Sequence, residues 1–202
     1  MRALSEKRPR GRPLEFDRNA ALRAAMLVFW KKGYEGATLA DLLEAMEISK
    51  PSLYAAFGDK DNLLSEAVRM YLELHAEDYT AALNLPTVRE VAGAWLRLTG
   101  GVREEAGVPP GCLLVQGSLV GSQASRVIQQ ELSTIQNEGT RQLEQRFQQA
   151  KRDGDLLGIL DPGSLAHYLS ALACGLAVQS SSGVSSEELN KVVDQVMAIW
   201  PD

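Results

Sequence analysis

Apolar residues recur along this chain with the 3.6-residue period of amphipathic α-helices, and no segment alternates strictly between apolar and polar positions as a half-buried strand does. In the first third of the chain the pattern predicts helices over about 17–33, 38–46, 51–57 and 60–82. Beyond Pro86 it predicts helices over about 87–105, 112–120 and 123–153, one that begins at Asp161 and one that begins at Ser185. We therefore expect an all-α fold of about nine helices.

Capping signals support several of these helix starts. Thr38 with Asp41, and Ser185 with Glu188, have the spacing of a capping box. Pro51 is acceptable only in a first helical turn, so a helix is expected to begin there. Asp161 followed by Pro162 gives the same kind of signal further along.

Charge divides the chain into two unequal parts. The whole chain of 202 residues has a formal net charge of −5, but residues 1–60 carry 11 basic and 8 acidic side chains, whereas residues 61–202 carry 10 and 18. A basic front end ahead of an acidic body suggests a polyanionic partner for the front end alone, although a solvated basic terminus would have the same composition. We expect a flexible basic arm over 1–15, a small domain over 16–60 and a larger domain over 61–202.

The predicted helices 38–46 and 51–57, joined by a tight break, have the dimensions of a helix-turn-helix. Such a unit places its second helix in the major groove of DNA, with the side chains at its front end near base edges. Any αα-hairpin has similar dimensions, and serine and threonine at helix starts are often only caps. The residues expected near DNA bases or phosphates are Thr38, Ser49, Lys50, Ser52, Tyr54 and Lys60.

The basic arm strengthens this interpretation. Its Arg-Gly-Arg-Pro run, from Arg10 to Pro13, is extended and cannot be helical. The run resembles the core of an AT-hook, which inserts arginines into a narrow A·T-rich minor groove. Arg10 and Arg12 are therefore expected to contact DNA beside the helix-turn-helix.

From Asp17 to Leu64 the sequence resembles the DNA-binding domain of the TetR family of bacterial transcriptional regulators. The likeness is carried by Ala24–Phe29 with Gly33-Tyr34, by Thr38–Leu42, by the block Ile48-Ser-Lys-Pro-Ser-Leu-Tyr-Ala-Ala-Phe57, and by Lys60 and Leu63. The resemblance implies three N-terminal helices, then a dimerising, ligand-binding body of about six. It implies Thr38, Tyr54 and Lys60 on phosphate, and Ser49, Lys50, Pro51 and Ser52 at the groove.

One position departs from the family pattern. Members often have glycine in the turn, where this chain has Glu47. If the turn needs a positive φ, glutamate is strained there; the alternative is a slightly altered turn.

The body is similar to a subset of the family at Gly111-Cys-Leu-Leu-Val115, and some members of that subset sense electrophiles or oxidants through a cysteine at this place. Cys112 begins a predicted helix, whose dipole can lower a thiol pKa, so it is a candidate sensor. Plain core packing is the competing role for each member of the expected ligand pocket, and Cys174 is expected to be inert. The expected pocket residues are Trp95, Leu98, Cys112, Leu113, Gln116 and Tyr168.

The segment from Leu165 to Val178 is apolar nearly all round, so a helix there must be covered on both sides. One side can pack on its own subunit and the other on a second copy, unless the helix is central in a monomer. Small residues within it and the apolar stripe from Leu189 to Trp200 suggest a two-fold interface. Its expected residues are Ala171, Gly175, Val193 and Met197.

Other classes of function find little support. No phosphate-loop, hydrolase-elbow or zinc-protease motif occurs, the two histidines lie far apart, and the two cysteines form no zinc-binding pair. We therefore expect no enzymatic activity, no metal and no cofactor, and a cytoplasmic location without membrane spans. The sequence predicts a homodimeric regulator, by resemblance a repressor, released from a palindromic DNA operator by a small molecule, an oxidant or an electrophile. The alternative is a helical adaptor that does not bind DNA.

Overall fold

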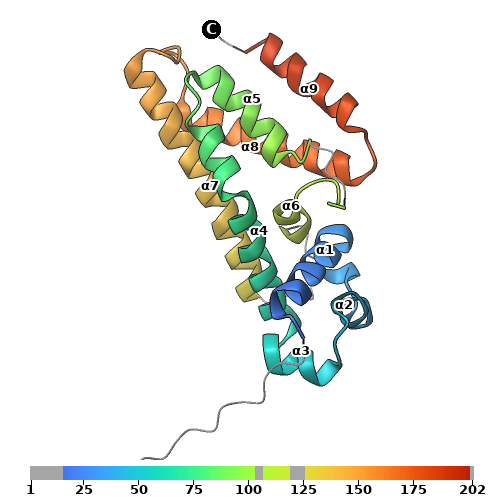
Figure 1. The fold of residues 1–202 in the computed structure, drawn as a ribbon. Coiled ribbons are helices and arrows are strands. Elements are labelled where there is room, and N and C mark those ends of the chain that lie inside the picture. Colours follow the sequence, from blue (N-terminus) through green and yellow to red (C-terminus); the bar gives the residue numbers. More distant parts are fainter. Residues whose placement is uncertain (1–15, 103–106, 119–125, 201–202) are drawn as a thin grey trace, which may run out of the picture.

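The computed structural model describes residues 16–102, 107–118 and 126–200, which form nine helices and no strand (Figure 1). The all-α prediction is therefore confirmed. The helices are α1 (Arg18–Gly36), α2 (Leu39–Met46), α3 (Lys50–Phe57), α4 (Lys60–Leu83), α5 (Val88–Thr99), α6 (Leu113–Ser118), α7 (Arg126–Asp153), α8 (Pro162–Ser181) and α9 (Ser186–Ala198). Across these described ranges no helix combines the length and apolarity needed to cross a bilayer.

The predicted caps are present. Both expected capping boxes form, at the starts of α2 and α9, and Asp161 accepts a hydrogen bond from the backbone N–H of Ser164 at the start of α8. The first helix runs further than expected, to Gly36, because the chain resumes a helical turn after Gly33, whose φ of 67° interrupts the helix. The helix expected over 87–105 ends at Thr99.

The long helices α4 and α7 connect two ends of the molecule (Figure 1). Helices α1, α2 and α3 form a small head at one end, and α5, α8 and α9 lie at the other, with α6 between them (Figure 1). One hydrophobic core joins the head to the first half of α4, to Cys112–Val115 and to Ile128 and Leu132 of α7. The second core lies among α5, α8, α9 and the second half of α7. The apolar core of the head thus continues past residue 60 into the body.

The turn between α2 and α3 places Glu47 in the left-handed region, with φ 54° and ψ 36°. It is the one non-glycine residue with positive φ among those the structure describes. Its N–H donates to the carbonyls of Leu43 and Glu44, so the backbone shape closes α2. Of the two expectations for this turn, the strained glutamate is the one observed.

We expect Glu47→Gly to raise the free energy of unfolding by about 0.5–1 kcal/mol. A left-handed backbone costs an L-residue roughly 1–2 kcal/mol, and glycine removes this strain from the folded state. Glycine also makes the unfolded chain more flexible, which offsets part of the stabilisation. Urea unfolding followed by circular dichroism measures the difference. The control is Glu44→Gly, the same change inside helix α2, which should destabilise by about 1 kcal/mol. A Glu47→Gly protein less stable than the parent would contradict the strain.

Candidate nucleic-acid interface and cavity

Helix α3 turns one face into the head and the other to solvent. Leu53 and Phe57 are buried in the head core, whereas Lys50, Pro51 and Tyr54 are exposed, Tyr54 to 48%. Figure 1 places α3 at the far end of the head, away from α5, α8 and α9. The predicted groove residues therefore share one accessible surface that a long, regular polymer could approach.

The front edge of this surface is fixed by two serines. Ser49 caps α3, and its Oγ accepts a hydrogen bond from the backbone N–H of Ser52 at 3.3 Å. The two hydroxyl oxygens also lie 2.9 Å apart, within hydrogen-bond distance of each other. Both serines thus shape the start of α3, and they stand beside Lys50 and Pro51 as the sequence predicts.

Thr38 acts as a helix cap. Its hydroxyl donates to Asp41 Oδ2 at 2.8 Å and accepts from the Asp41 backbone N–H at 3.1 Å. Asp41 Oδ1 lies 2.7 Å from Nζ of Lys32, and this lysine, followed by Thr38, lowers the pKa of Asp41 to about 2. The Thr38 hydroxyl proton is therefore already donated to Asp41. A phosphate oxygen, which needs a donor, could form a hydrogen bond with this hydroxyl only if the cap opened.

Lys60 lies against the head rather than reaching freely into solvent. Its Nζ is 4.2 Å from the centre of the Tyr34 ring, a cation–π contact, and partial burial lowers its pKa. The Tyr34 hydroxyl donates to Asp61, and burial followed by that contact raises the Tyr34 pKa. The predicted phosphate ligand is thus part of a small cluster at the start of α4.

Arg18, which the sequence did not single out, ties α3 to the head. Its Nη2 donates to both carboxylate oxygens of Glu66, at 2.7 and 2.8 Å, and to the Ala56 carbonyl at 3.1 Å. Its Cζ lies 4.4 Å from the centre of the Phe57 ring. The partners are 38 to 48 residues away in sequence, so no local pattern could have revealed them.

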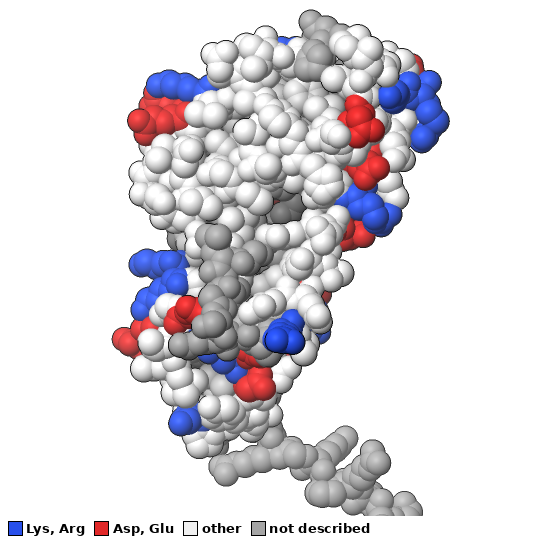
Figure 2. Space-filling model, turned by 180° about the vertical axis from the view of Figure 1, so that it is seen from behind, with Lys and Arg blue, Asp and Glu red and all other residues white. Residues whose placement is uncertain are grey.

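The arm residues Arg10 and Arg12 lie outside the described residues. On the face seen in Figure 2, lysine and arginine are interspersed with aspartate and glutamate in small groups, and most of the surface carries neither. This face therefore carries no broad surface of a single charge sign.

A cavity of about 750 Å³ lies in the body, bounded by α4, α5, α6, α7 and α8. Trp95 and Cys112, two of the six predicted pocket residues, line it. The other four do not: Leu98 and Leu113 are buried elsewhere, Gln116 is half-buried outside the lining, and Tyr168 is 49% exposed. Polar lining residues that the sequence did not indicate include Tyr79, Gln136, Thr140, His167, Ser170 and Cys174.

Cys112 connects this cavity to the head. Its Sγ lies 3.5 Å from the hydroxyl oxygen of Tyr71, which is deeply buried. The Tyr71 ring packs edge-on against Trp30 of the head helix α1, with ring centres 5.0 Å apart, and against His75 at 4.6 Å. Burial, followed by the electrostatic interaction with Cys112, raises the Tyr71 pKa well above its usual value. Packed contacts therefore lead from the thiol to the head helix α1.

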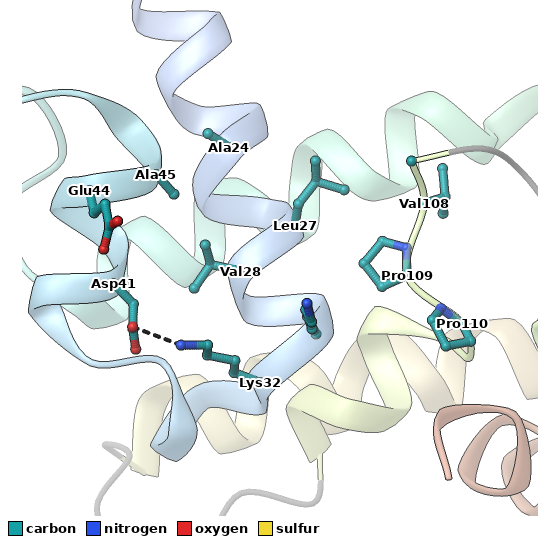
Figure 3. A pocket seen from close by; sticks show the side chains of 12 residues that line it. Ala24, Leu27, Val28, Lys32, Asp41, Glu44, Ala45, Val108, Pro109 and Pro110 are labelled. Carbon is teal, nitrogen blue, oxygen red and sulfur yellow. Dashed lines mark ion pairs between the residues drawn. The ribbon is translucent and has the colours of Figure 1, made fainter. Parts of the chain in front are cut away.

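A second hollow, of about 670 Å³, separates the head from the segment before Cys112 (Figure 3). Residues of α1, among them Leu27 and Val28, lie in its middle, Glu44 and Ala45 of α2 on one side and Val108 to Pro110 on the other, and the Lys32–Asp41 ion pair joins α1 to α2 there (Figure 3). Val108 still packs against the apolar core that includes the head helices, so this hollow lies beside a packed contact.

The predicted dimer residues divide into two groups. Ala171 and Gly175 are exposed on α8, and Met197 is half-buried on α9. Val193 is fully buried in the core of its own chain, so its inclusion in a surface between two copies is a correction. Exposed apolar side chains nearby are those of Tyr168 and Val178 on α8, and of Val192 and Ile199 at α9 and its C-terminal cap.

Comparisons with known proteins agree on one family. A model of bacterial regulatory proteins of the TetR family matches residues 21–67. The chain is 30% identical over 198 residues to the HTH-type transcriptional repressor ComR of Escherichia coli (strain K12), covering 97% of this chain and 94% of that protein. A cysteine mutant of the TetR family transcriptional regulator CifR, complexed with 26-bp double-strand operator DNA, superposes with a TM-score of 0.86. It is 41% identical, over 94% of this chain and all of that one.

Proposed function

The chain belongs to the TetR family of DNA-binding transcriptional regulators, and from this premise we propose that it is a homodimeric repressor of a palindromic operator, released by an effector that occupies the body cavity. The observation that carries the proposal is the placement of α3: its apolar face anchors it in the head core, and its other face presents Lys50, Pro51 and Tyr54 to solvent. Such a helix can enter a major groove without unfolding any part of the head. Similarity to CifR, solved on operator DNA, supports the same geometry.

In this proposal Lys50 and Tyr54 reach the groove and its phosphates, Ser49 and Ser52 set the front of α3, and Arg10 and Arg12 of the arm reach the adjacent minor groove. Thr38 and Lys60 contribute mainly by holding the starts of α2 and α4 near the DNA backbone, because their polar groups already have partners within the head. Backbone-facing groups of this kind set the register, while groove contacts select the sequence.

Two copies are needed to read a palindrome. The exposed apolar side chains on α8 and on α9 and its C-terminal cap, together with the exposed Ala171 and Gly175, offer a surface on which the same helices of a second copy can pack. A two-fold dimer would present its two α3 helices about one turn of DNA, ~34–36 Å, apart. Size-exclusion chromatography with light scattering tests the dimer independently of DNA.

Release requires a route from cavity to head. The contact from Cys112 to Tyr71, and from Tyr71 to Trp30 of α1, supplies one. Occupation of the cavity or modification of the Cys112 thiol would then change the spacing of the two heads. Couplings of about 1–3 kcal/mol between such sites correspond to roughly 5–150-fold changes in affinity.

The proposal is tested with DNA from upstream of the protein's own gene, mapped by footprinting and then titrated at several salt concentrations. For Lys50→Met we expect weaker binding and a dependence of log affinity on log salt that is shallower by about one unit, because one phosphate contact is lost. Lys50 is exposed at the start of α3, so the change should leave folding intact.

Arg152→Met is the matched control, since it removes the same charge from the exposed end of α7, far from the head. It should bind DNA as the parent does. A Lys50→Met protein with an unaltered salt slope would contradict the placement of α3 in the groove. A parent protein without any salt-linked DNA binding would favour the adaptor alternative instead.

A further inference from the structure

Both cysteines of the chain face the same cavity. Cys112 lies just before α6 and Cys174 lies in the middle of α8, and each lines the 750 Å³ hollow. No sequence pattern paired them, because they are far apart along the chain and Cys174 was expected to be inert. Neither sulfur is in a disulfide.

The backbone brings the segment beside Cys112, which is buried, against the helix that carries the exposed Cys174. The Gly111 backbone N–H donates to Ser180 Oγ of α8 at 3.0 Å. A Cβ on Gly111 would lie 2.8 Å from the Ala177 carbonyl oxygen, so the chain beside Cys112 lies directly against α8. Ala177 is three residues beyond Cys174, which is less than one turn of helix. The electrostatics agree: burial raises the pKa of Cys174, and nearby Cys112 raises it further.

The surroundings narrow the kind of ligand that two such thiols would take. Among the described residues, no three His, Cys, Asp or Glu side chains are close enough to hold a metal ion together. They therefore do not form a site for a metal ion that needs three or four protein ligands. Thiolates prefer soft, thiophilic centres. The cavity wall includes the paired rings of Tyr79 and Trp95, 6.0 Å apart, which offer an apolar surface to an organic substituent.

We propose that Cys112 and Cys174 form a dithiol site for a trivalent organoarsenical. Such a centre makes three bonds, one to its own organic group and two to sulfur, which matches two thiols beside an aromatic wall. In the reaction, the arsenic of an arsine oxide forms two As–S bonds. Its oxygen leaves with the two thiol protons as one molecule of water, and no redox change occurs. The site deepens the proposed function, on which it rests for its regulatory consequence.

The test uses the full-length protein and phenylarsine oxide, read by intact-mass spectrometry under native conditions. We expect one phenylarsenic group per chain that survives an excess of monothiol and is released by the dithiol dithiothreitol. Cys112→Ser and Cys174→Ser should each lose the adduct to monothiol, because a single As–S bond exchanges readily. Cys112→Ala serves as a second variant should serine be poorly accepted at that buried position, and circular dichroism confirms that each protein is folded.

Three results would overturn the dithiol site: an adduct that monothiol removes from the parent, one that persists in Cys174→Ser, or one that joins two chains. Operator affinity, measured on the same samples, separates this proposal from the proposed function. A stable adduct in a protein that never binds DNA would refute the proposed function and leave the site standing. DNA binding by a protein that forms no stable adduct would refute the dithiol site and leave the proposed function standing.

Discussion

Replacing Gly101 with alanine is expected to lower the free energy of unfolding by about 3 kcal/mol. A Cβ at this position would lie 2.3 Å from the carbonyl oxygen of Gly111 and 2.6 Å from its Cα. These are backbone atoms, which cannot move aside as the end of a flexible side chain can. The φ of +63° adds the usual penalty of a left-handed L-residue, so overpacking of about 1–3 kcal/mol and backbone strain of roughly 1–2 kcal/mol act together.

Gly154→Ala is the matched control for this experiment. Gly154 also has a positive φ, +82°, but a Cβ there would meet nothing within 4 Å. It should cost only the backbone strain, about 1 kcal/mol. Urea unfolding of both variants measures the difference, and equal losses would show that the close approach of Gly101 to Gly111 does not exist in solution.

This close approach also positions the segment before Cys112. Ser180 of α8, a buried polar residue, accepts a hydrogen bond from the Gly111 N–H at 3.0 Å and donates to the Gly101 carbonyl at 3.3 Å. One hydroxyl thereby joins the end of α5, the segment before Cys112 and α8. The placement of Cys112 in the cavity wall thus depends on two glycines and one serine that carry no chemistry of their own.

Features determined by neighbours in sequence were predictable. The helix starts at Thr38, Ser185 and Asp161 follow from side chains that bond to the backbone three residues on, and the structure confirms them. The strain at Glu47 was predictable for the same reason, because a turn between two helices limits its residues to few backbone conformations. Helix periodicity likewise predicted the all-α fold. The spacing of apolar residues shows that one face of each helix is buried, whichever segment of the chain covers that face.

Features that depend on distant segments were not predictable. Leu98 and Leu113 are as apolar as pocket residues should be, yet they are buried away from the cavity, because which helix covers them is decided by the packing of the whole body. Val193 and Val192 are neighbours on α9, yet Val193 is buried in the core of its own chain and Val192 is exposed. The apolar sequence pattern does not show which of the two faces the core. That Cys112 and Cys174 line the same cavity likewise depends on how residue 111 lies against α8.

The continuous core limits how the head can respond. Leu113 of α6 is packed in the same cluster as Phe29 and Leu53 of the head, so α6 cannot move without disturbing the packing beneath α3. Under the proposed function, a modification of Cys112 would act on the head through displaced side chains, because the packed core leaves no flexible hinge between them. Closely packed interiors transmit such shifts because they have little free volume to absorb them.

Arg18→Met should destabilise the head by about 2 kcal/mol and weaken operator binding about tenfold. The change removes the bidentate contact with Glu66, the hydrogen bond to the Ala56 carbonyl and the cation–π contact with Phe57. The ion pair is partly exposed, so most of the loss comes from the last two contacts and the seating of α3. If α3 is correctly seated only about a tenth of the time, apparent affinity falls by the same factor.

The salt dependence of binding distinguishes this role from a phosphate contact. Because Arg18 acts through Phe57 and Ala56 of α3, its loss should leave the slope of log affinity against log salt unchanged, whereas loss of Lys50 makes the slope shallower. Arg23→Met, which removes an exposed arginine further along the same helix α1, is the control and should retain the stability of the parent. If Arg18→Met instead flattened the salt slope while stability held, Arg18 would be a phosphate ligand and the seating of α3 would have another cause.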